Sequence, residues 1–137
     1  MNIVSVVGGN KFQRDIAEKV IFQMMATMLP RVRTLQIEVV IKKLTGDAVG
    51  WCLMGDTHKE FEIEVSRDLT LKDFITTLCH EMVHVKQYYR KETDGYGGVW
   101  KKKSVAKNTS YYDLPWEKEA YRMQDKLAQL VWDADVL

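Results

Sequence analysis

The chain has 137 residues, of which 46% are hydrophobic and 28% are charged. This length suits one domain with a single core, so we expect residues 1–137 to form one domain. The net charge of +1 is typical neither of a nucleic-acid-binding protein nor of an acidic one, and no apolar stretch approaches the length that crosses a membrane.

The two cysteines and the opening residues bear on the compartment. Cys52 and Cys79 form neither a metal-binding pair nor a disulfide framework, which is typical of a reducing environment. On a helix Cys79 would point about 100° away from His80, so we expect it in the core. The first residues lack the basic region and the long apolar run of a signal peptide. We therefore expect a cytoplasmic protein.

A first helix is expected after the glycines at positions 8 and 9. Asn10 can cap its first turn, and Gln13 can complete a capping box with it. Apolar residues then recur at every fourth position, at Phe12, Ile16, Val20, Met24 and Met28. Pro30 ends this apolar repeat. We expect this helix to fill part of the core and to pack on the sheet that follows.

Three strands are expected next, over residues 35–44, 49–54 and 60–66. In the first and third, apolar and polar residues alternate, as they do in a half-buried strand. Turn-forming residues separate the three segments at 45–47 and 55–57. Because short turns favour antiparallel neighbours, we predict a three-stranded antiparallel sheet.

The polar face of the third strand carries Glu60, Glu62 and Glu64. The simpler interpretation is a solvated face whose charges discourage aggregation through the sheet edge. The alternative is that this strand is itself an edge along which an extended peptide could pair, with the acidic side chains favouring some peptides over others.

A second helix is predicted over residues 70–90. Thr70 and Asp73 fit a capping box at its start. One face is apolar and consists of Leu71, Phe74, Ile75, Leu78, Met82 and Val85. His80 and His84 lie roughly opposite that face on a helical wheel. One side of this helix is therefore suited to a core and the other to chemistry.

The opposite side of this helix carries a His-Glu-x-x-His motif. His80 and His84 are four residues apart, so on a helix they lie one turn apart on the same side and could bind one metal ion. Glu81 lies beside them. In this motif the histidines bind zinc, and the glutamate is the general base that acts on the zinc-bound water.

Periodicity fails in residues 91–114, and we expect a long loop there. Asp94–Gly98 is rich in glycine, which predicts a flexible segment. A connection of this length is usually functional, and a flap that covers the substrate is a natural interpretation. Trp100 and the run Lys101–Lys103 could alternatively contact nucleic acid. Three lysines in a near-neutral chain favour a solvated loop instead.

A last helix is expected from Pro115 to Trp132, with Asp113 as its cap. Its buried stripe is predicted to consist of Trp116, Ala120, Met123, Leu127, Leu130 and Val131. A catalytic zinc ion usually has three protein ligands, and no histidine follows His84. The third ligand is therefore a carboxylate or His58. Glu117 and Glu119 lie at the two borders of the stripe, so periodicity does not choose between them.

The motif His80-Glu81-x-x-His84 followed by Glu117-x-x-Ala120 resembles the gluzincin metallopeptidases. This resemblance implies that Glu117 is the third zinc ligand and that Glu119 is its neighbour. The order of elements is also similar to a minimal zincin, as in small SprT-like and phage or bacterial zincin-like proteins. SprT-like enzymes usually have a third histidine, which this chain lacks downstream. Many gluzincins have an aspartate where this chain has Tyr121.

Together these features predict an α+β, zincin-like domain that acts as a zinc metallopeptidase on peptide or protein substrates. The expected order is an N-terminal helix, the sheet, the active helix, a loop that could keep the activity latent, and a ligand-bearing C-terminal helix. Four tyrosines could donate to the oxyanion, and sequence selects none of them: Tyr88, Tyr111, Tyr112 and Tyr121. Two alternatives stay open. One is a non-catalytic interaction module with a structural zinc ion, and the other is a DNA-associated protein.

Overall fold

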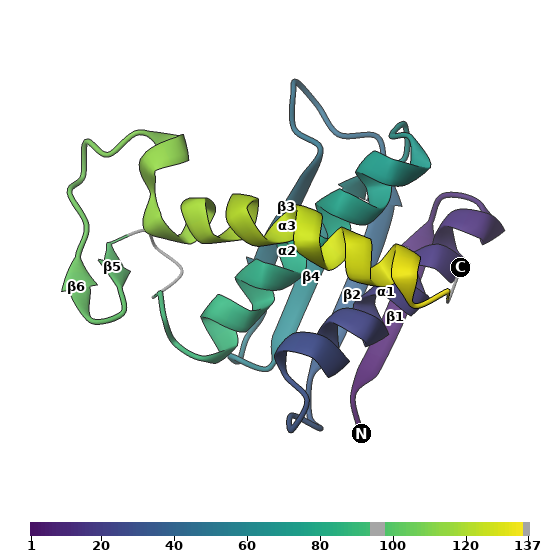
Figure 1. Cartoon of the computed structure of the whole chain (residues 1–137), viewed down its shortest axis with the longest axis horizontal. Coiled ribbons are helices and arrows are strands. Elements are labelled where there is room, and N and C mark those ends of the chain that lie inside the picture. Colours follow the sequence, from purple (N-terminus) through teal and green to yellow (C-terminus); the bar gives the residue numbers. More distant parts are fainter. Residues whose placement is uncertain (94–97, 136–137) are drawn as a thin grey trace.

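The computed structural model describes residues 1–93 and 98–135. It contains helices and a mixed sheet, so the predicted α+β class is confirmed (Figure 1). The elements follow one another as β1 (Ile3–Gly8), α1 (Lys11–Met28), β2 (Gln36–Lys42), β3 (Gly50–Met54), β4 (Glu60–Ser66), α2 (Leu71–Tyr89), β5 (Val99–Trp100), β6 (Lys103–Ser104), the 3-10 helix η1 (Tyr111–Asp113) and α3 (Pro115–Asp133).

The main sheet has four strands in the order β1-β2-β4-β3, so the prediction of a three-stranded antiparallel sheet was wrong. β1 and β4 both run parallel to β2, and only β3 runs antiparallel to its neighbour β4. The segment 43–49 carries the chain from β2 past the position of β4 to the sheet edge. β4 then returns to the centre, where its residues Phe61, Ile63 and Val65 are buried. β3 exposes Trp51 and Leu53, which suits an edge strand.

β1 is a strand that the sequence analysis did not assign. It pairs with β2 after the crossover through α1, and parallel strands require such a crossover. Gly8 ends β1 with φ of +82°, and a Cβ there would collide with the carbonyl oxygen of Ile41. The predicted capping box of α1 is confirmed. The backbone N–H of Gln13 donates to the side-chain oxygen of Asn10 at 2.8 Å, and the backbone N–H of Asn10 donates to the side-chain oxygen of Gln13 at 3.0 Å.

The three long helices lie on one face of the sheet (Figure 1). α1 packs against β1 and β2, and α2 packs against β3 and β4. α3 lies across the outer side of α2, and its far end reaches α1, where Gln23 donates to the carbonyl of Leu130 at 3.4 Å. The core between these layers is apolar and includes Val20, Ile21, Met24, Ile37, Val39, Ile63, Leu78 and Met82. Phe12 does not join it and is 60% exposed.

The opposite face of the sheet carries the glutamates of β4. Glu60, Glu62 and Glu64 are half-buried there, and Lys42 pairs with Glu64 at 2.9 Å. β4 has a hydrogen-bonded neighbour on each side, so the alternative that made this strand a peptide-binding edge was wrong. The edge strands of this sheet are β1 and β3, and β3 is the one that lies beside α2.

The segment between α2 and α3 is partly regular. β5 and β6 form a small antiparallel hairpin, and Thr93 bridges to Trp100. The predicted flexibility of Asp94–Gly98 falls largely on residues 94–97, which lie outside the described residues. Pro115 begins α3 as predicted, but Leu114 and not Asp113 occupies the capping position. Asp113 belongs to η1 instead, where it accepts a hydrogen bond from Ser110 at 2.7 Å.

In the described parts of the chain, every helix is too short or too polar to span a lipid bilayer.

Candidate metal centre

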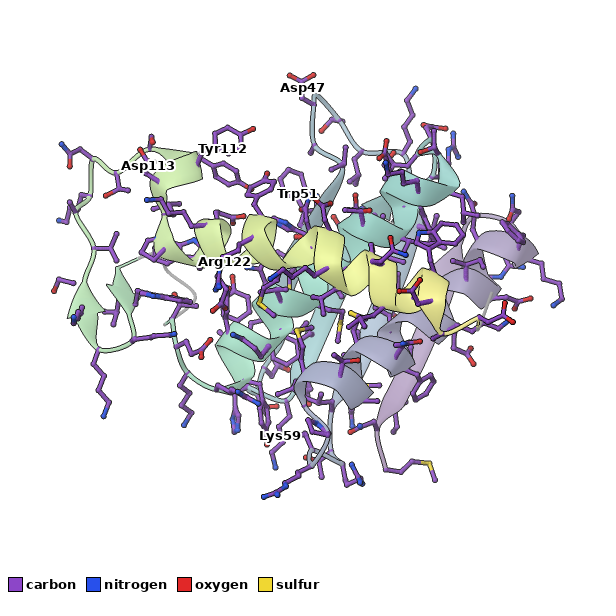
Figure 2. All side chains as sticks on the ribbon, viewed as in Figure 1. Asp47, Trp51, Lys59, Tyr112, Asp113 and Arg122 are labelled. Carbon is purple, nitrogen blue, oxygen red and sulfur yellow. The ribbon has the colours of Figure 1, made fainter. Side chains whose placement is uncertain are left out.

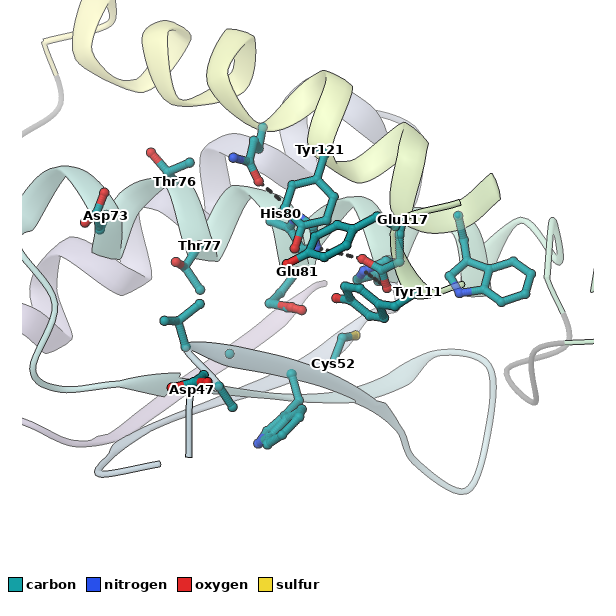
Figure 3. Close-up of a pocket in the computed structure, with 18 of the residues that line it drawn as sticks. Asp47, Cys52, Asp73, Thr76, Thr77, His80, Glu81, Tyr111, Glu117 and Tyr121 are labelled. Atoms are coloured by element: carbon teal, nitrogen blue, oxygen red, sulfur yellow. Dashed lines mark hydrogen bonds and ion pairs between the residues drawn. The ribbon is translucent and has the colours of Figure 1, made fainter. Parts of the chain in front are cut away.

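Two histidines and one glutamate converge where α3 crosses α2. Nε2 of His80 lies 3.1 Å from Oε1 of Glu117, and Nε2 of His84 lies 3.2 Å from the other oxygen, Oε2 (Figure 3). One ligand atom from each residue lies within 4.8 Å of the others, and all three side chains are buried. This cluster could hold a metal ion.

The crossing of the helices also separates the candidate third ligands. Glu117 points into the cluster, whereas Glu119 points to the other side of α3 and accepts a hydrogen bond from Lys86 at 2.6 Å. Ala120 is fully buried one turn after Glu117, where a small side chain allows the two helices to approach. His58 is not in the cluster, and its ring packs against Tyr89 with the centroids 5.6 Å apart.

Two glutamines fix the orientation of the imidazole rings. Nδ1 of His84 lies 2.8 Å from Oε1 of Gln87, and Nδ1 of His80 lies 2.9 Å from Oε1 of Gln124. The amide nitrogen of Gln87 donates to the Trp116 carbonyl at 2.9 Å, so its oxygen is the atom that faces His84. An amide oxygen only accepts, so Nδ1 of His84 must carry a proton. Its Nε2 is then the nitrogen available for a metal ion.

The charges in the cluster fit a cation between its three members. If both imidazoles were neutral, their Nε2 lone pairs would face the carboxylate oxygens of Glu117 and repel them. Burial alone would raise the pKa of Glu117, but hydrogen bonds and charges from His80 and His84 lower it to about 2. Burial disfavours the charged form of His84, yet Glu117 and Glu81 raise its pKa overall. Two imidazole nitrogens and one carboxylate also match the ligands of catalytic zinc sites.

Glu81 lies beside the cluster without belonging to it. Its carboxylate points from α2 toward β3 and lines the pocket (Figure 3). Only 4% of the residue is exposed, and this burial raises the pKa of Glu81 against the opposing charges of His84 and His80. A carboxylate with a raised pKa next to a possible metal site is suited to accept and return a proton.

The cluster opens into a pocket of about 650 Å³ between α2 and β3. Three tyrosines lie over it: Tyr111 and Tyr112 from η1 and Tyr121 from α3, whose ring is 4.6 Å from that of His80. Burial raises the pKa of Tyr111, and so does the nearby charge of Glu117. Tyr111 therefore keeps its proton and can act as a donor above the cluster.

The sequence analysis missed the residues that support this site. Gln87 follows His84 by three residues and Gln124 follows Glu117 by seven, and both spacings place the residues on one helix face. That spacing was the signal that could have identified them. Cys79 is buried in the core as predicted. Cys52 lines the pocket instead, where burial and the charge of Glu81 raise the pKa of its thiol.

Comparisons with protein-family models, with curated proteins and with solved structures each found no match. The resemblance to gluzincins therefore depends on the two motifs alone. What the structure adds is a buried group of two histidines and one glutamate that could hold a metal ion.

Proposed function

We propose that this protein is a zinc-dependent metallopeptidase. The observation that carries the proposal is the convergence of His80, His84 and Glu117 beside Glu81, at the bottom of a pocket bordered by the free edge of β3. Two imidazoles and one carboxylate are one of the ligand sets of catalytic zinc sites, in which the fourth position stays open.

The three ligands and Glu81 would divide the work of peptide hydrolysis. A bound zinc ion supplies the Lewis acidity and the lowered pKa of the attacking water. The Glu81 carboxylate accepts the proton of that water and passes it to the leaving amine. The Tyr111 hydroxyl, which lines the pocket beside the cluster, donates to the carbonyl oxygen as negative charge develops on it.

β3 supplies a place for the peptide chain. Among the described strands its only hydrogen-bonded neighbour is β4, so the backbone groups of its other edge are available along the pocket. An extended peptide can pair with such an edge and present its carbonyl groups to the cluster. This arrangement supports a peptide or protein substrate.

Substitution of Glu81 tests the proposal. We expect Glu81→Gln to lower the rate of peptide cleavage by about 10²–10⁴-fold, because the general base is lost. Zinc content should stay near one ion per chain, since Glu81 is not a ligand. Glu38→Gln, an exposed residue of β2 on the far face of the sheet, is the matched control and should cleave like the wild type. Unchanged cleavage by Glu81→Gln would exclude the general-base role.

The zinc content of the wild-type protein separates the enzyme from the alternatives. A stoichiometric zinc ion without any peptide cleavage would favour the non-catalytic interaction module. Zinc-independent binding of single-stranded DNA that weakens steeply with salt would favour the DNA-associated protein.

A further inference from the structure

The pocket between α2 and β3 has the dimensions of a linear cleft. Gly50 of β3 lies against Thr77 and Glu81 of α2, which fixes the register of the two elements. The cleft lining extends from Asp73 to Tyr88 on α2, about 22 Å of helix, and on the β3 side it runs from the turn at Asp47 into the strand as far as residue 53. The α2 side alone is long enough to lie along about six residues of extended peptide.

The two ends of this cleft differ chemically. At the start of α2 and β3 it is lined by Asp73, Asp47, Thr76 and Thr77 (Figure 3). Figure 2 shows Asp47 at the tip of the loop that precedes β3. The other end is aromatic, with Tyr88, Tyr111 and Trp116. The possible metal site lies between these two ends.

The cleft is also acidic in a protein that is nearly neutral overall. Its described lining contains four carboxylates, Asp47, Asp73, Glu81 and Glu117, but neither lysine nor arginine. A divalent ion would offset the charges of Glu81 and Glu117. Within the described residues, no ion pair involves Asp47 or Asp73, so both charges remain available to a ligand.

The direction of a bound peptide follows from the strand. A peptide that adds to the β3 edge in the more stable antiparallel sense runs from Leu53 toward Asp47. Its C-terminal half then lies at the acidic end and its N-terminal half at the aromatic end. Asp73 precedes His80 by seven residues, about 10 Å of helix, which equals about three residues of extended peptide.

We infer that the preferred substrates are extended peptides with a lysine or arginine two or three residues after the cleaved bond and a bulky apolar residue before it. This inference rests on the proposed peptidase function. Asp47 and Asp73, which line the same end of the cleft, select the basic side chain, and the aromatic end receives the apolar one. Negatively charged peptides and nucleic acid are disfavoured by the same carboxylates.

Matched eight-residue peptides test the inference. They share a phenylalanine before the central bond and differ only at the third residue after it, which is lysine, norleucine or glutamate. Cleavage by the zinc-loaded wild type is followed by mass spectrometry, and binding to zinc-loaded Glu81→Gln is followed by fluorescence anisotropy. We expect the lysine peptide to exceed norleucine by about fivefold in both measurements and glutamate to be weakest.

Substitution of the acidic end provides the second arm. Asp47→Asn, in an exposed loop, and the double variant with Asp73→Asn should reduce the lysine preference in steps, to about twofold or less in the double variant. Asp56→Asn, an exposed residue outside the cleft, is the control and should keep the full preference.

The two readouts separate this inference from the proposed function. Cleavage of all three peptides at equal rates would overturn the specificity while the peptidase function stands. Preferential binding of the lysine peptide without cleavage by the wild type would overturn the peptidase function while the specificity stands. Equal binding, or no binding of any peptide, would overturn the specificity.

Discussion

Glu81 is a carboxylate that the fold buries at a cost. Its pKa is raised because burial disfavours the charged form. A folded-state pKa above the unfolded value means that the folded protein binds the proton more tightly. The free energy of unfolding therefore falls as the pH rises from the unfolded pKa through the folded one.

Removal of this charge should stabilise the metal-free protein. We expect metal-free Glu81→Gln to be more stable than the wild type at pH 7 by about 1 kcal/mol, or about 3 °C in Tm. At pH 4 the difference should largely disappear, because the wild-type carboxyl is then protonated. Calorimetry of both proteins in the presence of a chelator measures this, and a less stable variant at pH 7 would contradict it.

Conservative substitutions can distinguish the roles of the tyrosines above the cluster. Tyr111→Phe removes a hydroxyl from the pocket that Glu117 also lines, and we expect kcat to fall about a hundredfold with KM nearly unchanged. Tyr112 also lines the pocket and is the more exposed of the two, at 69% against 51%, so Tyr112→Phe is the comparison variant and should have much the smaller effect. Steady-state kinetics on one peptide decides the assignment, and an equal effect of the two substitutions would remove Tyr111 from the proposed mechanism.

At the scale of elements, the contact of α2 with α3 has two polar halves. On one side Glu117 meets the histidines, and on the other Glu119 accepts hydrogen bonds from Lys86 at 2.6 Å and Gln87 at 3.1 Å. Lys86 also pairs with Glu92 at 3.0 Å. Gln87 links the halves, because its oxygen faces His84 while its nitrogen donates to Glu119.

The two glutamates should therefore give opposite phenotypes. We expect Glu117→Ala to lose zinc with a modest effect on folding. Glu119→Ala should destabilise the protein by about 3 kcal/mol, because it removes one partner of the buried Lys86. Metal analysis and denaturant unfolding of both variants test this. Loss of zinc only in Glu119→Ala would overturn the ligand assignment.

The close approach of β3 to α2 depends on Gly50. A Cβ at this position would lie 2.7 Å from Cγ2 of Thr77 and 3.1 Å from the carbonyl oxygen of Glu64. We expect Gly50→Ala to move the edge strand from the active helix, at a cost of about 1–3 kcal/mol and with a clear loss of cleavage. The added substitution Thr77→Ser deletes the Cγ2 methyl and should restore part of the lost stability and part of the lost cleavage activity. Unfolding and peptide cleavage of the single and double variants measure this.

Prediction from sequence succeeded where the signal is local. The starts and ends of α1 and α2 follow from apolar spacing and from caps such as Asn10 and Thr70. The pairing of the strands could not be predicted in the same way. The seven residues between β2 and β3 can lead to a neighbouring position in the sheet or pass over it, and only the packing of the whole domain decides which. The histidines were found from their spacing. Periodicity did not choose between Glu117 and Glu119, the resemblance to gluzincins favoured Glu117, and the packing of α3 brings Glu117 to the histidines.

At the scale of the whole molecule, the cluster joins the outermost helix to the rest of the fold. α3 lies on α2, and its first turn supplies Glu117. A metal ion at the cluster would therefore add a link between the outer layer and the core.

Zinc binding should accordingly raise thermal stability. A ligand that binds only the folded state at a hundred times its Kd stabilises by about 2.7 kcal/mol. For a domain of this size we expect Tm to rise by about 10 °C. The rise should depend on zinc concentration, reverse with a chelator and vanish in Glu117→Ala. Scanning calorimetry tests this, and the same rise in that variant would place the zinc elsewhere.

The length of the groove beside β3 has a consequence for which proteins could be digested. Six consecutive residues of a substrate protein must break the hydrogen bonds that they make within that protein before they can pair with β3. In a native domain stable by about 5–15 kcal/mol, a core segment is released only in rare opening events, whereas a tail or a damaged chain offers it at all times. Digestion would then follow how often each target opens. Such a protease would distinguish misfolded clients from intact ones without a separate recognition domain.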